Sequence, residues 1–190
     1  MSDLSEDIAV LQGRFAEGVV ALTEFRGEHT LEVKLEVLRE VMVFANQDLG
    51  YDFLLDVSSL DHFGSDPRFE MVYELATVDD AKHLRVRAKV AEDEEVPTVV
   101  DLWAGAEWHE REVYDMMGIR FTGHPDLRRI LMWEGYPYHP LRKDFPLAGR
   151  PSEMPDVAFT GVAPMEGGPF VTSAGAEDPV RREPRSKAMD

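Results

Sequence analysis

Two neighbouring stretches alternate apolar and polar side chains, and this pattern constrains the fold more than any other feature of the sequence. On one face of residues 68–78 the apolar side chains are Phe69, Met71, Tyr73 and Leu75. On one face of residues 83–90 they are Leu84, Val86, Ala88 and Val90. A period of two is typical of a strand that buries one face. Because only a short polar link separates the two stretches, we predict an antiparallel hairpin.

Apolar side chains at helical spacing predict the elements that cover this hairpin. Residues 3–16 form one such helix, and a second helix begins after residue 35 and ends near Gly50. Further strands are predicted within residues 19–35 and 51–63. This order of elements predicts an α+β fold with a small, mostly antiparallel or mixed sheet and helices packed on one face.

A third helical region is predicted in residues 98–118. Thr98 is a suitable N-cap, and Asp101 three residues later completes a pattern that resembles a capping box. Gly105 is unfavourable inside a helix, so we expect a break there and two short helices. Gly118 is placed to end the second of them in a left-handed conformation.

Composition excludes several classes of function. The chain of 190 residues contains no cysteine, so it offers no disulfide, no thiolate-held iron–sulfur cluster and no cysteine nucleophile. It begins with neither a signal peptide nor a transit peptide, and no stretch approaches the roughly 18 apolar residues of a membrane span, so we expect a soluble, cytosolic chain. The net charge of −17 argues against nucleic acid or anionic lipid as a partner.

Residues 107–147 form the candidate functional stretch, because they combine basic and aromatic side chains at unusual density. The basic or histidine side chains are His109, Arg111, His124, Arg128, Arg129, His139, Arg142 and Lys143. The aromatic side chains among them are Trp108, Tyr114, Phe121, Trp133, Tyr136, Tyr138 and Phe145. Such mixtures are typical of the centres of protein interfaces. This stretch therefore predicts a protein-docking surface.

Proline stiffens part of this stretch, since Pro140 and Pro146 flank the basic residues between them. A fixed backbone loses little entropy when its charged side chains dock on a partner. The alternative interpretation is that the charged side chains pair within the domain and only fix its loops; it applies to Arg111, Asp126, Arg128 and Asp144.

Motifs for catalysis are incomplete. His109-Glu110 opens like the zinc-binding pattern H-E-x-x-H, but residue 113 is Val113, so the second histidine is missing. His124 and Asp126 would hold a metal only with help from a distant residue. The sequence contains neither a glycine-rich nucleotide fingerprint nor a G-x-S-x-G nucleophile elbow. We therefore expect no catalytic, cofactor-binding or metal-binding residue in this chain.

The composition changes after residue 150. Residues 151–190 contain six of the twelve prolines and four glycines, with no sustained period. Such a segment does not fold alone. We predict an α+β domain in residues 1–150 that ends in the stretch 107–147, followed by an extended C-terminal arm in residues 151–190 that lies along a partner.

The stretch also carries a resemblance to a known family. HEREVYDMMGIRFTGHPDLRRIL and, after a short gap, HPLRKDFPL resemble the 30 kDa, or C, subunit of respiratory complex I, the proton-translocating NADH:quinone oxidoreductase. The likeness covers roughly residues 20–150. It departs from the family pattern at His109, where an aromatic side chain is expected, and at Met117, where phenylalanine is common.

The resemblance implies a cofactor-free subunit of the hydrophilic arm, with FMN, iron–sulfur clusters and quinone held in partner subunits. It implies docking on the quinone-site (49 kDa, or D-type) subunit and on neighbouring iron–sulfur subunits, at the cytoplasmic face of the bacterial plasma membrane. The residues to which it assigns partner-binding roles are Glu110, Arg111, Asp126, Arg128, Arg129, His139, Arg142, Lys143 and Asp144.

Two alternatives stay open at this point. Homologous subunits of membrane-bound hydrogenases and ferredoxin-linked oxidoreductases share the same signature, and they differ in the electron donor of the whole complex. The other alternative is an independent metal hydrolase that uses histidine and aspartate.

Overall fold

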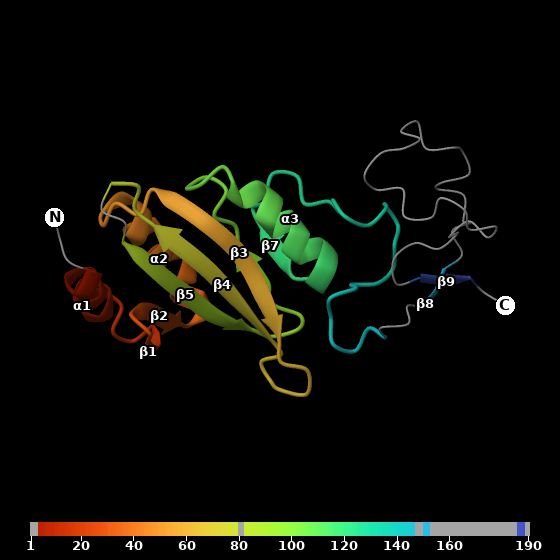
Figure 1. Cartoon of the computed structure of the whole chain (residues 1–190), viewed down its shortest axis with the longest axis horizontal. Coiled ribbons are helices and arrows are strands. Elements are labelled where there is room, and N and C mark those ends of the chain that lie inside the picture. The colour runs from red at the N-terminus through yellow and green to blue at the C-terminus, as the bar shows by residue number, and fades with distance from the viewer. Residues whose placement is uncertain (1–3, 80–81, 147–149, 153–185, 189–190) are drawn as a thin grey trace. The chain divides into compact units, whose positions relative to one another are not determined.

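The centre of the fold is a five-stranded mixed sheet (Figure 1). The computed structural model describes residues 4–79, 82–146, 150–152 and 186–188. The chain divides into two units, residues 1–142 and 143–190. The first unit contains α1 (Leu4–Arg14), β1 (Val19–Phe25), β2 (Glu28–Val33), α2 (Leu35–Gln47), β3 (Phe53–Asp61), β4 (Phe69–Ala76), β5 (His83–Val90), β6 (Glu95–Pro97), α3 (Ala106–Met117) and β7 (Arg120–Thr122).

The second unit contains two short strands in its described part, β8 (Arg150–Ser152) and β9 (Ser186–Ala188), which pair in parallel. Most of the predicted C-terminal arm, residues 153–185 and 189–190, lies outside the described residues. The predicted boundary between residues 150 and 151 therefore stays a prediction.

The strands of the sheet follow the order β1-β2-β5-β4-β3. The predicted hairpin is confirmed: β4 and β5 pair antiparallel, with Tyr73 opposite Val86. β2 and β5 pair in parallel, which makes the sheet mixed. The chain leaves β2 at one side of β5, passes through α2 and returns in β3 at the far edge, so the helix carries the crossover.

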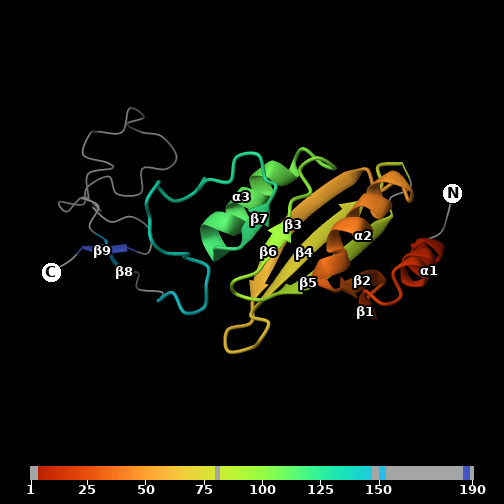
Figure 2. The ribbon, with the colours of Figure 1, turned by 180° about the vertical axis from the view of Figure 1, so that it is seen from behind.

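The helices predicted in the first half are confirmed, and α2 covers one face of the sheet. In Figure 1 this helix lies behind the strands, and in Figure 2, seen from the other side, it lies in front of them. Its buried side chains include Leu38, Val41 and Met42, which join Tyr73 and Leu84 of the sheet in one hydrophobic core. Burying each large apolar side chain contributes about 1.5–3 kcal/mol.

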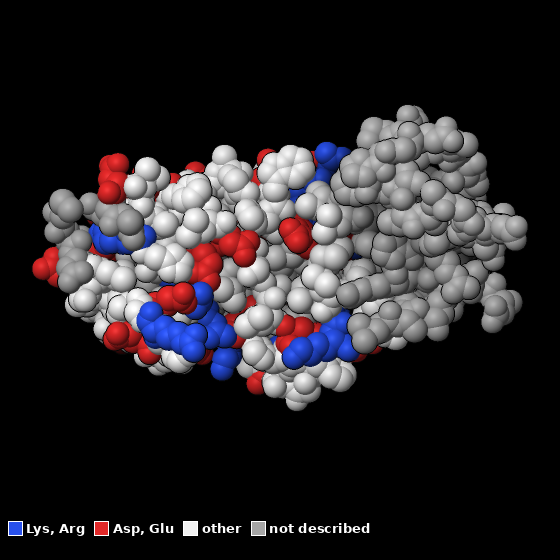
Figure 3. All heavy atoms as spheres, viewed as in Figure 1, with Lys and Arg blue, Asp and Glu red and all other residues white. Residues whose placement is uncertain are grey.

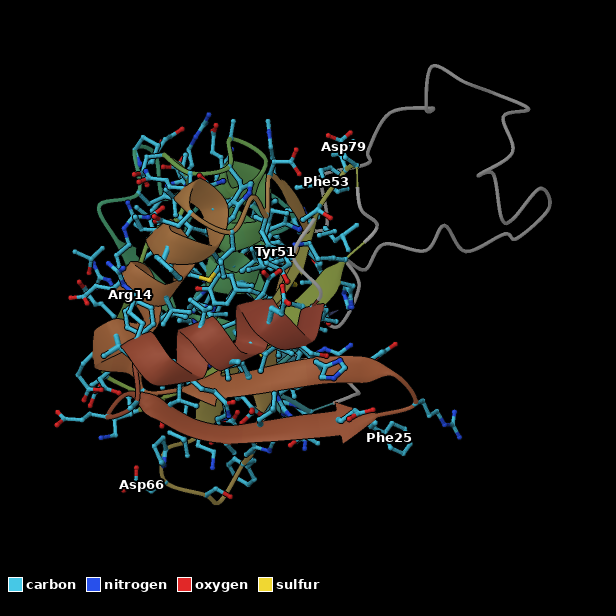
Figure 4. The ribbon with its side chains drawn as sticks, turned by 90° about the vertical axis from the view of Figure 1, so that its left-hand side faces the viewer. Arg14, Phe25, Tyr51, Phe53, Asp66 and Asp79 are labelled. Carbon is cyan, nitrogen blue, oxygen red and sulfur yellow. The ribbon has the colours of Figure 1, made fainter. Side chains whose placement is uncertain are left out.

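The first helix is fixed by a buried carboxylate. Asp7 of α1 accepts hydrogen bonds from the Tyr51 hydroxyl at 3.3 Å and from Lys82 Nζ at 2.7 Å. Figure 4 shows α1 lying over the β1–β2 hairpin, with Tyr51 in the interior beyond it and Phe25 at the exposed end of the hairpin. The apolar side chains Ile8 and Leu11 complete the attachment of α1 to the core.

The opposite face of the sheet carries cross-strand ion pairs. Glu70 on β4 accepts from Arg87 on β5 at 2.5 Å and from His62 at 2.7 Å. Figure 3 shows basic and acidic side chains side by side over this face. Glu70 and Val72 are buried, so both faces of β4 are more enclosed than the simple alternation predicts. The partners of Glu70 explain this, because their long side chains lie across it.

The prediction of two short helices in residues 98–118 is wrong. Residues 98–105 form turns, and a single helix, α3, begins after Gly105. Thr98 does not cap a helix, because no helix begins directly after it: its hydroxyl accepts from the Val100 N–H at 3.3 Å within the turn and donates to the Glu110 carboxylate at 2.6 Å. Trp103 is buried in the turn, and its indole N–H donates to the Tyr51 carbonyl at 3.1 Å. The prediction for Gly118 is confirmed, since this residue caps α3 with φ +78°.

Two short strands were not predicted. β6 and β7 pair in parallel, with Val96 opposite Phe121, and both side chains are buried. The strand before α3 and the strand after it therefore lie side by side. Within the described part of the chain, no helix is long and apolar enough to cross a membrane.

Candidate functional site

Asp115, on the last full turn of α3, holds the loop that follows β7. Its Oδ2 accepts from the backbone N–H groups of Ile130, Leu131 and Met132 at 3.0, 2.7 and 2.8 Å. Its Oδ1 accepts from Arg129 Nη1 at 2.5 Å. Asp115 is fully buried, and charge-assisted bonds of this kind are about twice as strong as neutral ones. The carboxylate therefore fixes three successive residues of the loop.

The same loop satisfies the carbonyl groups that α3 leaves unpaired at its C-terminus. The Asp115 carbonyl accepts from Arg129 Nη1 at 3.1 Å and faces His139 Nδ1 at 3.0 Å. The Met116 carbonyl accepts from the Leu141 N–H at 3.1 Å, and the Met117 carbonyl accepts from Arg142 Nε at 2.6 Å. Cations near a helix C-terminus also interact favourably with the helix dipole. We call residues 124–142, held in this way on α3, the signature loop.

Gly118 allows the signature loop to approach the helix this closely. A Cβ at this position would come within 2.6 Å of both His139 Nε2 and Arg142 Nη2. Its φ of +78° is also strained for any residue with a side chain. Burial, together with the nearby charges of Arg142 and Arg129, lowers the pKa of His139 below its usual value. The imidazole is therefore neutral at pH 7, and its Nδ1–H donates to the helix carbonyl.

Arg111 binds the signature loop from the side of the helix. Its Nε and Nη2 donate to the carbonyl oxygens of Arg128 and Arg129 at 3.1 and 3.4 Å. Its guanidinium lies 5.0 Å from the centre of the Trp108 ring, which is a cation–π contact. Arg111 is buried, so this charge acts inside the domain.

Several large side chains remain exposed around these fixed groups. Trp108 and Leu131 are each 60% exposed, and Leu141 is also exposed. The Arg128 side chain is 70% exposed and pairs with Asp126 at 2.7 Å. An exposed Trp and an exposed Arg on backbone that is held by buried polar bonds have the composition and the preorganisation of an interface hot spot.

Glu110 faces the opposite way from this surface. It is fully buried, its Oε1 accepts from the Val99 N–H at 2.8 Å, and its Oε2 accepts from the Thr98 hydroxyl at 2.6 Å. Burial raises the pKa of Glu110 to about 7, and the two hydrogen bonds oppose this rise. Glu110 therefore attaches the turn at residues 98–105 to α3.

The nine predicted docking residues thus lie in different environments. Asp126 and Arg128 are exposed at the surface of the signature loop. Arg111, Arg129, His139 and Arg142 bind main-chain oxygens within the domain, and Glu110 is buried. Lys143 and Asp144 belong to the second unit. Whether any of the nine contacts a partner stays a prediction.

The central role of Asp115 was not predicted. Arg111 and Asp115 lie four residues apart on the helix, but Arg111 binds the loop carbonyls and Asp115 binds Arg129. No sequence pattern predicts that three backbone N–H groups converge on one carboxylate. The only available signal was an acidic side chain near the C-terminus of a helix, where the dipole disfavours it.

The predicted candidate metal ligand His124 forms hydrogen bonds within the chain. His124 Nδ1 accepts from the Asp126 N–H at 3.0 Å, and His124 Nε2 lies 3.2 Å from the Glu107 carbonyl. Both ring nitrogens are therefore used within the chain. Among the residues that the structure describes, no three His, Asp or Glu side chains are grouped so that they could hold a metal ion.

Comparison with models of protein families shows to which family the chain belongs. Residues 31–151 match the model of the respiratory-chain NADH dehydrogenase 30 kDa subunit family. The chain belongs to this family. The matched segment of the 30 kDa subunit family contains the whole of the sheet except β1 and the start of β2, together with α3 and the signature loop.

Named relatives agree with the 30 kDa subunit family. The C subunit of the NADH-quinone oxidoreductase of Citrifermentans bemidjiense is 44% identical over 150 residues, which cover 78% of this chain and 93% of that protein. The second C subunit of the NADH-quinone oxidoreductase of Rhizobium meliloti is 40% identical over 161 residues, which cover 84% and 88%.

A solved structure has the same fold. The match is a chain of the membrane-bound sulfane sulfur reductase, an archaeal respiratory membrane complex, with a TM-score of 0.63 and 22% identity. It covers 75% of this chain and 85% of the other.

Proposed function

We propose that this chain is a cofactor-free structural subunit of the hydrophilic arm of a proton-translocating NADH:quinone oxidoreductase. In this function it docks on the quinone-site subunit and neighbouring iron–sulfur subunits, which hold FMN, iron–sulfur clusters and quinone. It supports electron transfer from NADH to quinone, coupled to proton translocation, by holding partner subunits together. Its place is the cytoplasmic face of the bacterial plasma membrane, where it is bound through the complex. The relatives that are C subunits of NADH-quinone oxidoreductases support this proposal.

The observation that carries the proposal is the way the signature loop is built. Asp115, Arg111, Arg129 and the carbonyls at the end of α3 use their polar groups to fix this loop. What the loop presents to solvent is Arg128 and Leu131, beside Trp108 on the adjacent helix. A rigid surface of this kind is suited to bind a protein, because little side-chain and backbone entropy remains to be lost.

The division of the predicted docking residues follows from this geometry. Asp126 and Arg128 are exposed, and we assign to them direct contacts with the partner. Arg111, Arg129, His139 and Arg142 act by positioning the loop from inside. Glu110 positions α3 itself.

The experiment that tests the proposal is affinity purification of a tagged chain from native membranes, with the companions identified. We expect the Arg128→Glu variant to fold and to lose its quinone-site partner. Arg120→Glu is the matched control, because the Arg120 side chain is 72% exposed, also pairs with a carboxylate, and lies on β7 outside the signature loop. Loss of the partner with both variants, or with neither, contradicts the assigned surface.

The same purified complex distinguishes the remaining alternatives. A complex that oxidises NADH supports the proposal, whereas one that uses only ferredoxin or hydrogen indicates the related hydrogenase or ferredoxin-linked class. A stoichiometric metal in the isolated chain that is lost on changing His124 and Asp126 would indicate the independent hydrolase instead.

A further inference from the structure

Glu110 is a buried ionisable group whose hydrogen bonds position α3, but whose titration has no part in the docking function. It lies on α3 with no exposed surface, and its carboxylate accepts no hydrogen bond from Lys or Arg within the described part of the chain. Its two donors there, the Thr98 hydroxyl and the Val99 N–H, are both neutral. A buried carboxylate without a hydrogen-bonded cation is costly, and such groups tend to bind a proton instead.

The charged groups around Glu110 do not neutralise it. On α2, Arg39 donates to the Thr98 carbonyl at 3.1 Å, but its Nη2 is bound to the Asp101 carboxylate at 2.5 Å. The positive charge of Arg39 favours the ionised form of Glu110, and the negative charge of Asp101 opposes it. The nearest cation therefore already has a carboxylate partner.

The other elements packed near α3 add no further cation beside Glu110. On β4, the Tyr73 hydroxyl is buried without a hydrogen-bond partner, and the charge of Glu110 helps to raise the pKa of this phenol. On β3, Asp56 pairs with His109 at 3.0 Å. On β7, Arg120 pairs with Glu95 of β6 at 3.6 Å. In each of these pairs the basic side chain is bound to another carboxylate.

The Thr98 hydroxyl can serve both protonation states of Glu110. When the carboxylate is ionised, the hydroxyl donates to Oε2 across 2.6 Å. When Oε2 carries a proton, the same two oxygens keep their contact with the direction reversed, because a hydroxyl both donates and accepts. The Val99 N–H continues to donate to Oε1 in either state. The hydroxyl oxygen also accepts from the Val100 N–H at 3.3 Å, so its second lone pair accepts the bond from the protonated carboxyl group.

We propose that Glu110 and Thr98 form a proton-binding site in the folded chain, in which uptake of one proton by the carboxylate reverses the hydrogen bond between the two side chains. The site binds a proton from solvent and requires no other reactant. It does not depend on the proposed function, since Glu110 and Thr98 lie outside the signature loop and bind each other within this chain. Burial places its titration close to neutral pH.

The test is a carbon-13 NMR titration of the full chain labelled at the glutamate side-chain carboxyls. We expect one carboxyl resonance to titrate at about pH 7. We expect that resonance to be absent from Glu110→Gln and present in the control Glu107→Gln. If all glutamates titrate in the ordinary range, or if the shifted resonance persists in Glu110→Gln, the proton-binding site is wrong.

A second comparison tests the reversal of the hydrogen bond. Thr98→Val removes the hydroxyl, and Thr98→Ser retains it. The hydroxyl also accepts from the Val100 N–H at 3.3 Å, so Thr98→Val is compared with the same change in Glu110→Ala, which has no carboxyl group and in which the loss of the Val100 contact is the same. We expect the midpoint of urea denaturation to fall further in the parent background than in Glu110→Ala at about pH 5 and at about pH 9, and Thr98→Ser to be close to the parent chain at both. An excess loss that is confined to the higher pH would overturn the reversal, since the hydroxyl would then bind only the ionised carboxylate.

Discussion

The imidazole of His139 lies directly against Gly118, at a distance that excludes a side chain. A Cβ built on Gly118 would be 2.6 Å from His139 Nε2, which is closer than real Cβ contacts come. The contact joins the end of α3 to the far end of the signature loop, because His139 Nδ1 is in turn bound to the Asp115 carbonyl at 3.0 Å. The conformation of the loop therefore depends on a glycine in the helix cap.

Gly118→Ala is the first prediction from this contact. The methyl group adds a steric clash to the strain of a positive φ, so we expect the variant to be destabilised by about 1–3 kcal/mol and the loop to be displaced from α3. Urea denaturation and the chemical shifts of His139 measure the two effects. Gly135→Ala is the control, because it has the same sign of φ but nothing within 4 Å of its Cβ. Equal effects in the two variants would show that the clash contributes nothing.

The second prediction concerns the carboxylate of Asp115. Asp115→Asn retains the shape of the side chain but replaces one of its two oxygens with an NH2 group. In one orientation this NH2 group faces Arg129, and in the other it faces the three N–H groups of the loop. We expect a loss of about 2–4 kcal/mol in stability, since buried donors are left unsatisfied. Amide hydrogen exchange at Ile130, Leu131 and Met132 checks the cause.

We expect exchange at these three amides to accelerate in Asp115→Asn. Amides in the strands of the central sheet are expected to exchange only through global unfolding, as in the parent chain. Asp126→Asn is a suitable comparison, because that carboxylate lies at the exposed surface of the same loop. If the three amides remain protected in Asp115→Asn, the carboxylate does not hold the loop.

The features of the fold and of the signature loop that could be predicted from sequence are those that depend on residues close together in the chain. The β4–β5 hairpin and the end of α3 at Gly118 were predictable, because alternation and helix caps are local patterns. The hydrogen bond from Thr98 to Glu110 was not predictable, because the same threonine, with Asp101 three residues later, also fits the pattern of a helix N-cap. The family resemblance identified the signature loop, but the bonds that hold it depend on the convergence of residues far apart in sequence, such as Met117 and Arg142, which are 25 positions apart.

Tyr73 supports a third prediction. Its hydroxyl is fully buried and has no hydrogen-bond partner among the described residues, so it is desolvated without compensation by them. Tyr73→Phe removes that group and leaves the ring in the core. We expect the variant to be as stable as the parent chain or more stable by up to about 2 kcal/mol, measured by urea denaturation. A substantial loss of stability would reveal a hydrogen bond of this hydroxyl in solution.

The last prediction is the dependence of stability on pH that arises from Glu110. Its pKa is about 7 in the folded chain, against an ordinary value of 4.5, so the folded state binds the proton more tightly than the unfolded state. The stability that this proton contributes is fully present below about pH 4.5 and is lost as the pH rises through about 7. The difference of about 2.5 pKa units corresponds to an upper limit on the order of 3 kcal/mol.

Glu110→Gln isolates this contribution, because the amide has nearly the same shape, keeps an acceptor for the Val99 N–H and does not titrate. We expect the free energy of unfolding of the parent chain, relative to that of Glu110→Gln, to fall between about pH 4.5 and pH 7 and to be constant at higher pH. Other groups titrate equally in both chains and cancel in the difference. A difference that does not change with pH would mean that Glu110 ionises as easily in the folded chain as in the unfolded one.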